Sequence, residues 1–229
     1  MDKIIVAIDG FSSCGKSTMA KQLAREVGYI YVDTGAMYRA VSLFCYRNGW
    51  MTDDQMDVEK IEKNMSNIHL EFKINLKGTA EMYLNGENVE SEIRSLEISN
   101  GASRVSTLGA VRRELVRQQQ QMGEQKGIVM DGRDIGTIVF PNAELKIFLT
   151  ATPEIRAQRR MDELLAKGES VVYEEVLANV KERDYRDQNR TESPLRKADD
   201  AVVIDNSELS LKEQQILLRK LFDKRIGIA

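Results

Sequence analysis

The sequence predicts an α/β fold in which helices flank a mainly parallel sheet and a small antiparallel β insert interrupts the pattern. Short apolar runs rich in Ile and Val, such as KIIVAI at 3–8, have the composition of strands buried on both faces. They alternate with longer segments whose apolar residues recur every three or four positions, as in helices with one buried face. Between 67 and 89, short strands with turn residues replace this alternation.

The first fifty residues form the clearest unit. A strand at 3–8 is followed by a glycine-containing loop and by a helix at 17–27, with Met19, Leu23 and Val27 on one face. A second strand at 29–32 and a helix at 34–47 come next, and Thr34 stands in the N-cap position. Strand, loop, helix and strand in this order predict a βαβ unit.

The remaining elements follow from the same rules. The β insert is predicted from IHLEFKI and AEMYL, with turns at Lys77-Gly78 and Asn85-Gly86. Helices are expected at 97–121, 154–167, 173–189 and 211–224, and strands at 128–130, 146–149 and 201–204. The sequence contains neither an internal repeat nor a low-complexity tract.

Composition excludes several classes of function. The 229 residues carry a formal net charge of −3, which does not favour a nucleic-acid polymer or an anionic membrane as partner. No apolar run is long enough to cross a bilayer or to form the core of a signal peptide. Cys14 and Cys45 form no spacing pattern, so we expect a cytoplasmic protein. With His69 as the only histidine, neither a zinc site nor a histidine-based catalytic pair is expected.

Residues 10–18, GFSSCGKST, match the phosphate-binding pattern Gly-x4-Gly-Lys-Ser. The pattern lies between a predicted strand and a predicted helix. Glycines let backbone N–H groups approach phosphate oxygens, and the start of a helix favours anions. Lys16 would reach the β- and γ-phosphates, and Ser17 would ligate Mg²⁺. The loop is therefore predicted to bind a nucleoside triphosphate.

Two residues of this loop are unusual. We expect Phe11 to pack beneath the loop. Cys14 has two interpretations: a small side chain turned away from the phosphates, or a reactive thiol whose pKa is lowered by Lys16 and the helix start.

Five further segments occur in an order typical of one family: YVDTGAMYR (31–39), SEIRSLEIS (91–99), MDGRDIGTIVFP (130–141), KIFLTATPEIRAQRR (146–160) and KERDYRDQNR (181–190). Together they resemble the bacterial cytidylate kinases, which phosphorylate CMP and dCMP with ATP. The resemblance covers nearly the whole chain. The family usually has Pro at the position of Phe11 and Ser or Ala at that of Cys14.

The resemblance implies a three-layer P-loop kinase fold with a central, mainly parallel five-stranded sheet, formed as a single domain over 1–229. Within it, the core comprises 1–62, 101–155 and 196–229. The β-rich insert at about 63–100 lies on the nucleoside monophosphate side. A lid spans about 156–190. The family is generally monomeric, so a monomer is expected.

The resemblance also implies the roles of individual residues. Those expected to bind ATP are Gly10, Ser12, Ser13, Cys14, Gly15, Lys16, Ser17, Thr18, Arg156 and Arg160. Those expected to bind CMP are Thr34, Arg39, Ser103, Arg112, Arg133, Asp134, Arg183, Asp187 and Arg190. The catalytic residues are expected to be Lys16, Arg133, Arg159 and Arg190, and Ser17 to bind Mg²⁺, partly through water.

The chemistry of the reaction is consistent with these residue types. The phosphate of CMP carries close to two negative charges at neutral pH, because its second pKa is about 6. Such an acceptor needs no general base. It needs cations that hold two repelling phosphates in line, and arginines supply them. A carboxylate can accept a hydrogen bond from the cytosine amino group. The resemblance implies that Asp134, with Ser103 and Arg112, reads the cytosine edge.

Several residues keep a second interpretation. Arg112, Arg159 and Arg160 have the pattern of solvated surface charges. Asp131 either assists Mg²⁺ through water or anchors its loop. On the 173–190 helix, the apolar stripe of Tyr173, Val176, Leu177 and Val180 continues into Arg183, Asp187 and Arg190. This charged end either faces a cleft or frays into solvent.

Other functions remain open at this stage. One is a related P-loop kinase whose acceptor is UMP, AMP or shikimate. Another is a non-catalytic nucleotide-binding switch, although the sequence has no guanine-reading Asn-Lys-x-Asp stretch.

Overall fold

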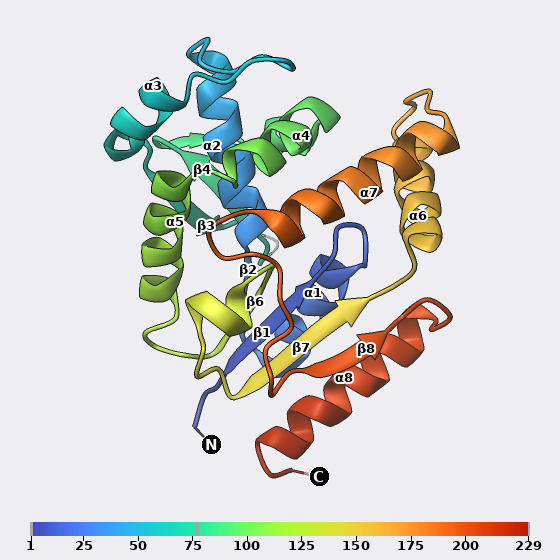
Figure 1. The fold of residues 1–229 in the computed structure, drawn as a ribbon. Coiled ribbons are helices and arrows are strands. Elements are labelled where there is room, and N and C mark those ends of the chain that lie inside the picture. Colours follow the sequence, from blue (N-terminus) through green and yellow to red (C-terminus); the bar gives the residue numbers. More distant parts are fainter. Residues whose placement is uncertain (1, 77, 229) are drawn as a thin grey trace. The chain divides into compact units, whose positions relative to one another are not determined.

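The computed structural model describes residues 2–76 and 78–228 (Figure 1). These residues separate into two compact units. The first unit comprises Met1–Tyr31 and Gly123–Ala229, and the second is Val32–Met122. Among the described residues, none of the helices has both the length and the apolar character needed to cross a membrane.

A five-stranded parallel sheet, most of which belongs to the first unit, confirms the predicted fold class. The strand order is β2-β6-β1-β7-β8, with β1 paired in parallel to both β6 and β7, and β7 paired in parallel to β8. The bounds are β1 (Ile5–Gly10), β2 (Ile30–Asp33), β6 (Ile128–Gly132), β7 (Leu145–Thr150) and β8 (Val202–Asp205). Every residue of β1 and β6 is buried, which explains their continuous apolar sequences.

The α-helices of the described part of this unit are α1 (Lys16–Val27), α6 (Pro153–Ala166), α7 (Tyr173–Asn189) and α8 (Leu211–Arg225). In Figure 1, α6 and α7 lie side by side. Helix α8 packs against α1. Val176 and Val180 of α7 are buried against Ala157 and Leu164 of α6. The predicted inward stripe of α7 is therefore confirmed.

The second unit contains the antiparallel insert, with strand order β3-β4-β5. Asn85 and Gly86, at φ 51° and 86°, form a tight turn that needs two left-handed residues, as the Asn-Gly signal predicts. The other predicted turn includes Lys77, which lies outside the described residues. The elements of this unit are α2 (Thr34–Arg47), α3 (Val58–Lys63), β3 (Leu70–Ile74), β4 (Ala80–Leu84), β5 (Glu87–Asn88), α4 (Leu96–Val105) and α5 (Gly109–Met122).

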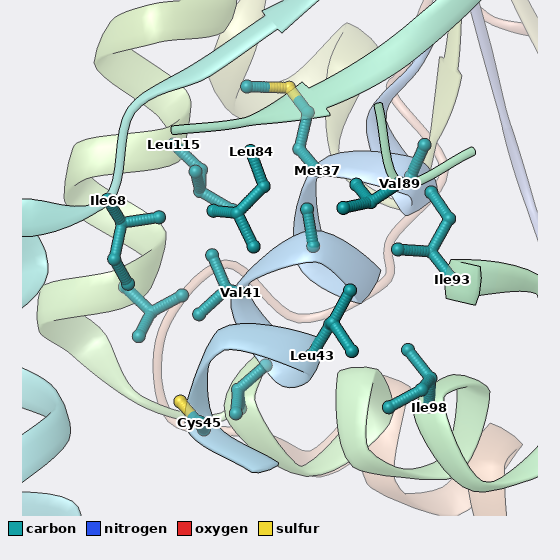
Figure 2. Close-up of a cluster of buried hydrophobic side chains, with 14 of the residues drawn as sticks. Met37, Val41, Leu43, Cys45, Ile68, Leu84, Val89, Ile93, Ile98 and Leu115 are labelled. Carbon is teal, nitrogen blue, oxygen red and sulfur yellow. The ribbon is translucent and has the colours of Figure 1, made fainter. Parts of the chain in front are cut away.

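The core of the second unit surrounds α2. Figure 2 shows Met37, Val41 and Leu43 of this helix among side chains from the insert and from the neighbouring helices. Leu84 and Leu115 are among the partners, and both are almost fully buried. The insert is therefore packed onto α2 by an apolar face.

Two predictions about helix ends are wrong. The single helix expected at 97–121 is two helices, α4 and α5. Between them, the Ser106 hydroxyl donates to the Ser103 carbonyl (2.9 Å) and the Thr107 hydroxyl to the Arg104 carbonyl (2.8 Å), which competes with helix continuation. The N-cap of α2 is Asp33 rather than Thr34, because the Asp33 carboxylate accepts the Ala36 N–H (2.9 Å).

Candidate active site

The loop between β1 and α1 has the backbone of an anion-binding loop. A Cβ on Gly10 would lie 2.0 Å from the Leu149 carbonyl oxygen, so only glycine fits there. Ser13 and Gly15 adopt positive φ angles of 57° and 83°. Gly15 is the N-cap of α1 and offers no side-chain cap, so the first amides of this helix have no capping side chain.

Polar groups in this loop lie in a buried setting. Lys16 is 5% exposed, and its Nζ donates to the Phe11 carbonyl at 2.5 Å. Burial, and after it the nearby positive charge of Arg133, lower the pKa of Lys16 to about 8. Among the described residues, the Ser12 hydroxyl is buried without a hydrogen-bond partner. Phosphate oxygens would supply a counter-charge for Lys16 and an acceptor for Ser12.

Phe11 and Cys14 are packing residues in this structure. The Cys14 side chain is fully buried in the core of the first unit, while its carbonyl accepts a hydrogen bond from Asn206 Nδ2 (2.7 Å). Phe11 packs edge-on against Phe148, and the Arg156 guanidinium lies 5.0 Å from the Phe11 ring centroid. This burial favours the packing interpretation of Cys14.

Ser17, Asp131 and Tyr31 form a hydrogen-bonded group beside the loop. The Ser17 hydroxyl donates to one carboxylate oxygen of Asp131 (3.0 Å), and the Tyr31 hydroxyl donates to the other (2.7 Å). Hydroxyl and carboxylate oxygens are ligands that Mg²⁺ accepts, and Mg²⁺ often binds through one or two protein groups together with phosphates. Within the described ranges, no group of three or more His, Cys, Asp or Glu residues forms a protein-only metal site.

The charged end of α7 is buried in what we call the arginine cluster, formed by Arg133, Asp134, Arg183, Asp187 and Arg190. Arg133 Nε donates to Asp187 (2.7 Å), while Arg190 lies 3.6 Å from Asp187 and 3.9 Å from Asp134. Burial alone would raise the pKa of Asp187, but Arg133 and Arg190 outweigh it and lower that pKa. Because Asp187 and Arg190 are 6% and 8% exposed, fraying into solvent is excluded for this end of the helix.

The three arginines of α6 have different surroundings. Arg156 is 2% exposed and forms a two-bond ion pair with Asp184 of α7 (2.9 and 2.6 Å). Arg159 donates to the side chain and the backbone carbonyl of Asn206 (3.0 and 2.8 Å), in the loop between β8 and α8. Arg160 pairs with Glu163 on the same helix (3.2 Å). None of the three is a fully exposed surface charge.

In the second unit, Asp33 joins two arginines at the start of α2. Its carboxylate lies 2.9 Å from Arg39 and 3.0 Å from Arg94, and Arg94 also pairs with Glu90. Burial would raise the pKa of Asp33, but the guanidinium groups of Arg39 and Arg94 hold it well below its usual range. Thr34 is buried beside this cluster at the first position of α2.

Ser103 and Arg112 lie on α4 and α5 of the second unit. Arg112 is 1% exposed, so the interpretation as a solvated surface charge is wrong. Its Nη1 donates to the Ser106 carbonyl (3.2 Å), and its guanidinium lies 5.5 Å from the Tyr38 ring centroid. The turn that separates α4 from α5 therefore also contacts this arginine.

The predicted site residues thus form groups within each unit. The first unit holds the phosphate loop, the arginine cluster and the arginines of α6. The second holds Thr34, Arg39, Ser103 and Arg112.

Four charged or polar residues were not predicted from the sequence. Arg94 lies in the quoted segment SEIRSLEIS, and Asp9 is a carboxylate at the end of an otherwise apolar strand, so both carried a signal. Asp184 lies in the quoted segment KERDYRDQNR, so it carried a signal as well. Asn206 carried none, because its partner Arg159 is distant in sequence.

Comparison with known proteins gives a consistent picture. A family model described as cytidylate kinase matches residues 6–220. The chain is 58% identical to a cytidylate kinase from Parabacteroides distasonis, over 99% of this chain and 100% of the relative. It is 61% identical to one from Flavobacterium johnsoniae, over the full length of both. A solved structure of an uncharacterised protein from Eubacterium ventriosum is similar in fold alone, with TM-score 0.50, 11% identity and coverage of 97% of this chain and 99% of that chain.

Proposed function

The chain belongs to the cytidylate kinase family, and from this premise we propose that it transfers the γ-phosphoryl group of ATP to CMP or dCMP, producing ADP and CDP or dCDP. It is a nucleoside monophosphate kinase, a phosphotransferase. The observation that carries the proposal is that one unit contains both a phosphate-binding loop and a buried cluster of arginines. A non-catalytic nucleotide-binding switch would not need the cluster of arginines.

The loop at 10–18 is proposed to bind the phosphates of ATP. Its backbone amides and Lys16 balance the charge of the β- and γ-phosphates, and the buried Ser12 hydroxyl gains an acceptor. Ser17, and Asp131 through water, would hold Mg²⁺, which supplies charge neutralisation at the phosphates when bound. Further contacts to ATP are proposed from the backbone of Ser13, Cys14, Gly15 and Thr18. The lid at about 156–190 is proposed to contribute Arg156 and Arg160.

The arginine cluster is proposed to bind the acceptor. Arg133 and Arg190 would hold the phosphate of CMP, and Arg183 and Asp187 its ribose. Because Asp187 orients Arg133 and Arg190 before CMP arrives, little reorganisation is needed on binding. Arg159, with Lys16, Arg133 and Arg190, would stabilise the charge of the transferring group.

Cytosine recognition is proposed to rest on Asp134, Ser103 and Arg112. Arg39 is proposed to bind the phosphate of CMP together with Arg133 and Arg190, and Thr34 to lie near its ribose. Asp134 and Arg112 are both buried, at 4% and 1% exposed. Buried polar groups discriminate strongly, since a base lacking the matching donor leaves them unsatisfied. We further propose that the enzyme acts as a monomer in the cytoplasm, with the single-domain organisation predicted above.

The test is ADP production from ATP and Mg²⁺ with CMP, dCMP, UMP, AMP or shikimate as acceptor. We expect CMP and dCMP to be phosphorylated with the highest kcat/KM. If UMP or AMP were phosphorylated as efficiently as CMP, the cytidylate assignment would be wrong. Omission of Mg²⁺ is expected to abolish turnover with every acceptor.

A further inference from the structure

Asp9, the second-last residue of β1, has a buried carboxylate with two backbone partners. Its Oδ1 accepts the N–H of Ile135 (2.8 Å) and its Oδ2 accepts that of Gly136 (2.7 Å). Asp9 is 4% exposed. One side chain thus joins the strand that leads into the phosphate loop to the segment that follows β6.

These two amides begin a π-helical turn at Ile135–Val139. The first N–H groups of a helical turn need an acceptor, which is ordinarily the side chain of the N-cap residue. Here the N-cap residue is Asp134, and it makes no capping bond with its side chain. Asp9, more than a hundred residues away in sequence, provides the cap.

The residues around the Asp9 carboxylate allow the turn at Ile135–Val139 to approach it closely. A Cβ on Gly136 would lie 3.4 Å from Asp9 Oδ2 and 3.2 Å from Lys146, so glycine permits the close approach of the turn to the carboxylate. Burial raises the pKa of Asp9 to about 7, opposed by the bonds from Gly136 and Ile135. An apolar residue at this strand position would avoid the desolvation of a carboxylate but would leave both amides without an acceptor.

We propose that Asp9 is a positioning residue for the acceptor site: by capping the turn at Ile135–Val139 it orients Asp134 and Arg133 and leaves the Asp134 carboxylate directed to cytosine. This inference rests on the proposed function, in which Asp134 and Arg133 bind CMP. Asp9 itself touches neither substrate. Substitution of Asp9 should therefore change the use of CMP and leave the binding of ATP nearly unchanged.

The test compares Asp9→Asn with wild type. Asn has nearly the same shape but one acceptor atom in place of two, so one amide of the turn faces an NH2 group. We expect kcat/KM for CMP to fall about tenfold or more, since small displacements of positioning groups have effects of this order or larger. The ratio of kcat/KM for CMP to that for UMP is expected to fall as well, while KM for ATP stays within about twofold.

Glu144→Gln is the matched control. The Glu144 carboxylate accepts the Ile5 N–H (2.9 Å), at the opposite end of the same strand β1. Its substitution also removes a carboxylate that binds a backbone amide, but we expect no change in either KM or in the CMP/UMP ratio.

The outcomes separate the inference from the proposed function. If wild-type enzyme shows no preference for CMP, the proposed function fails. If wild type prefers CMP and Asp9→Asn keeps that ratio, or loses ATP and CMP binding equally, the positioning role is wrong. Should Asp9→Asn fail to fold, Asp9→Glu, which retains both acceptor oxygens, is measured in the same way. A drop in the CMP/UMP ratio with ATP binding retained supports the role, and an unchanged ratio overturns it.

Discussion

Asp33 in the second unit and Asp187 in the first are similar residues in different structural settings. Each is 6% exposed, each pairs with two arginines, and arginines lower the pKa of each against the opposing effect of burial. Asp33 also accepts the Ala36 N–H and thereby caps α2. The Asp187 carboxylate instead pairs with the guanidinium groups of Arg133 and Arg190.

Because of this difference, we expect a mainly structural role for Asp33 and a mainly functional role for Asp187. The Asp33 carboxylate fixes the start of α2, the helix around which the core of the second unit is packed. The Asp187 carboxylate holds side chains that are proposed to bind a phosphate. We therefore expect substitutions of Asp33 to reduce stability, and substitutions of Asp187 to reduce activity.

The largest expected effect is that of Asp33→Ala. It removes the cap and leaves Arg39 and Arg94 without their shared carboxylate. Breaking a buried pair and a cap together should lower the free energy of unfolding by about 3 kcal/mol or more. Urea denaturation followed by circular dichroism measures this change. A loss below about 1 kcal/mol would show that the cluster contributes little to folding.

Measuring the unfolding free energy at several pH values separates the contribution of the Asp33 charge from that of its capping hydrogen bond. Because its pKa is lower in the folded protein than the ordinary 3.8, its ionisation stabilises the fold above about pH 4, and this contribution is lost as the pH falls. Asp33→Asn keeps a capping oxygen but has no charge to lose. The difference in unfolding free energy between wild type and Asp33→Asn should therefore shrink as the pH is lowered from about 6 to 3. A constant difference over this range would contradict the assigned ion pairs.

Asp187→Asn is expected to have a smaller effect, and on activity. A neutral amide cannot hold both Arg133 and Arg190, so kcat/KM for CMP should fall about tenfold. Its loss of unfolding free energy should be less than that of Asp33→Ala. Steady-state kinetics and urea denaturation on the same preparations check both parts. If Asp187→Asn kept full activity but lost much of its unfolding free energy, the functional role proposed for Asp187 would be wrong.

The parallel sheet could be predicted from sequence because its signals are local. Continuous apolar strands and the glycine loop occur within short stretches, and the observed order of elements follows them. The division of the 97–121 segment into two helices could not be predicted. No Pro marks the break, which is accompanied by side-chain bonds of Ser106 and Thr107 to nearby carbonyls.

In the candidate site, too, only features with a local sequence signal could be predicted. The spacing of Gly10, Gly15 and Lys16 predicts a phosphate-binding loop without any knowledge of the fold. Asp9 was missed because its partners, Ile135 and Gly136, are distant in sequence and their amides carry no residue-specific signal. Arg112 lies in a charged sequence but is buried, since the neighbouring turn and Tyr38 cover it.

The most direct test of the central claim, that the segment after β6 reads the base of the acceptor, is the CMP/UMP ratio of kcat/KM for wild type and Asp134→Ala. Loss of the carboxylate should reduce this ratio about tenfold, within the range of about 1–3 kcal/mol for a side chain that discriminates between bases, while KM for ATP changes little. An unchanged ratio, or an equal loss of CMP and ATP binding, would contradict the account.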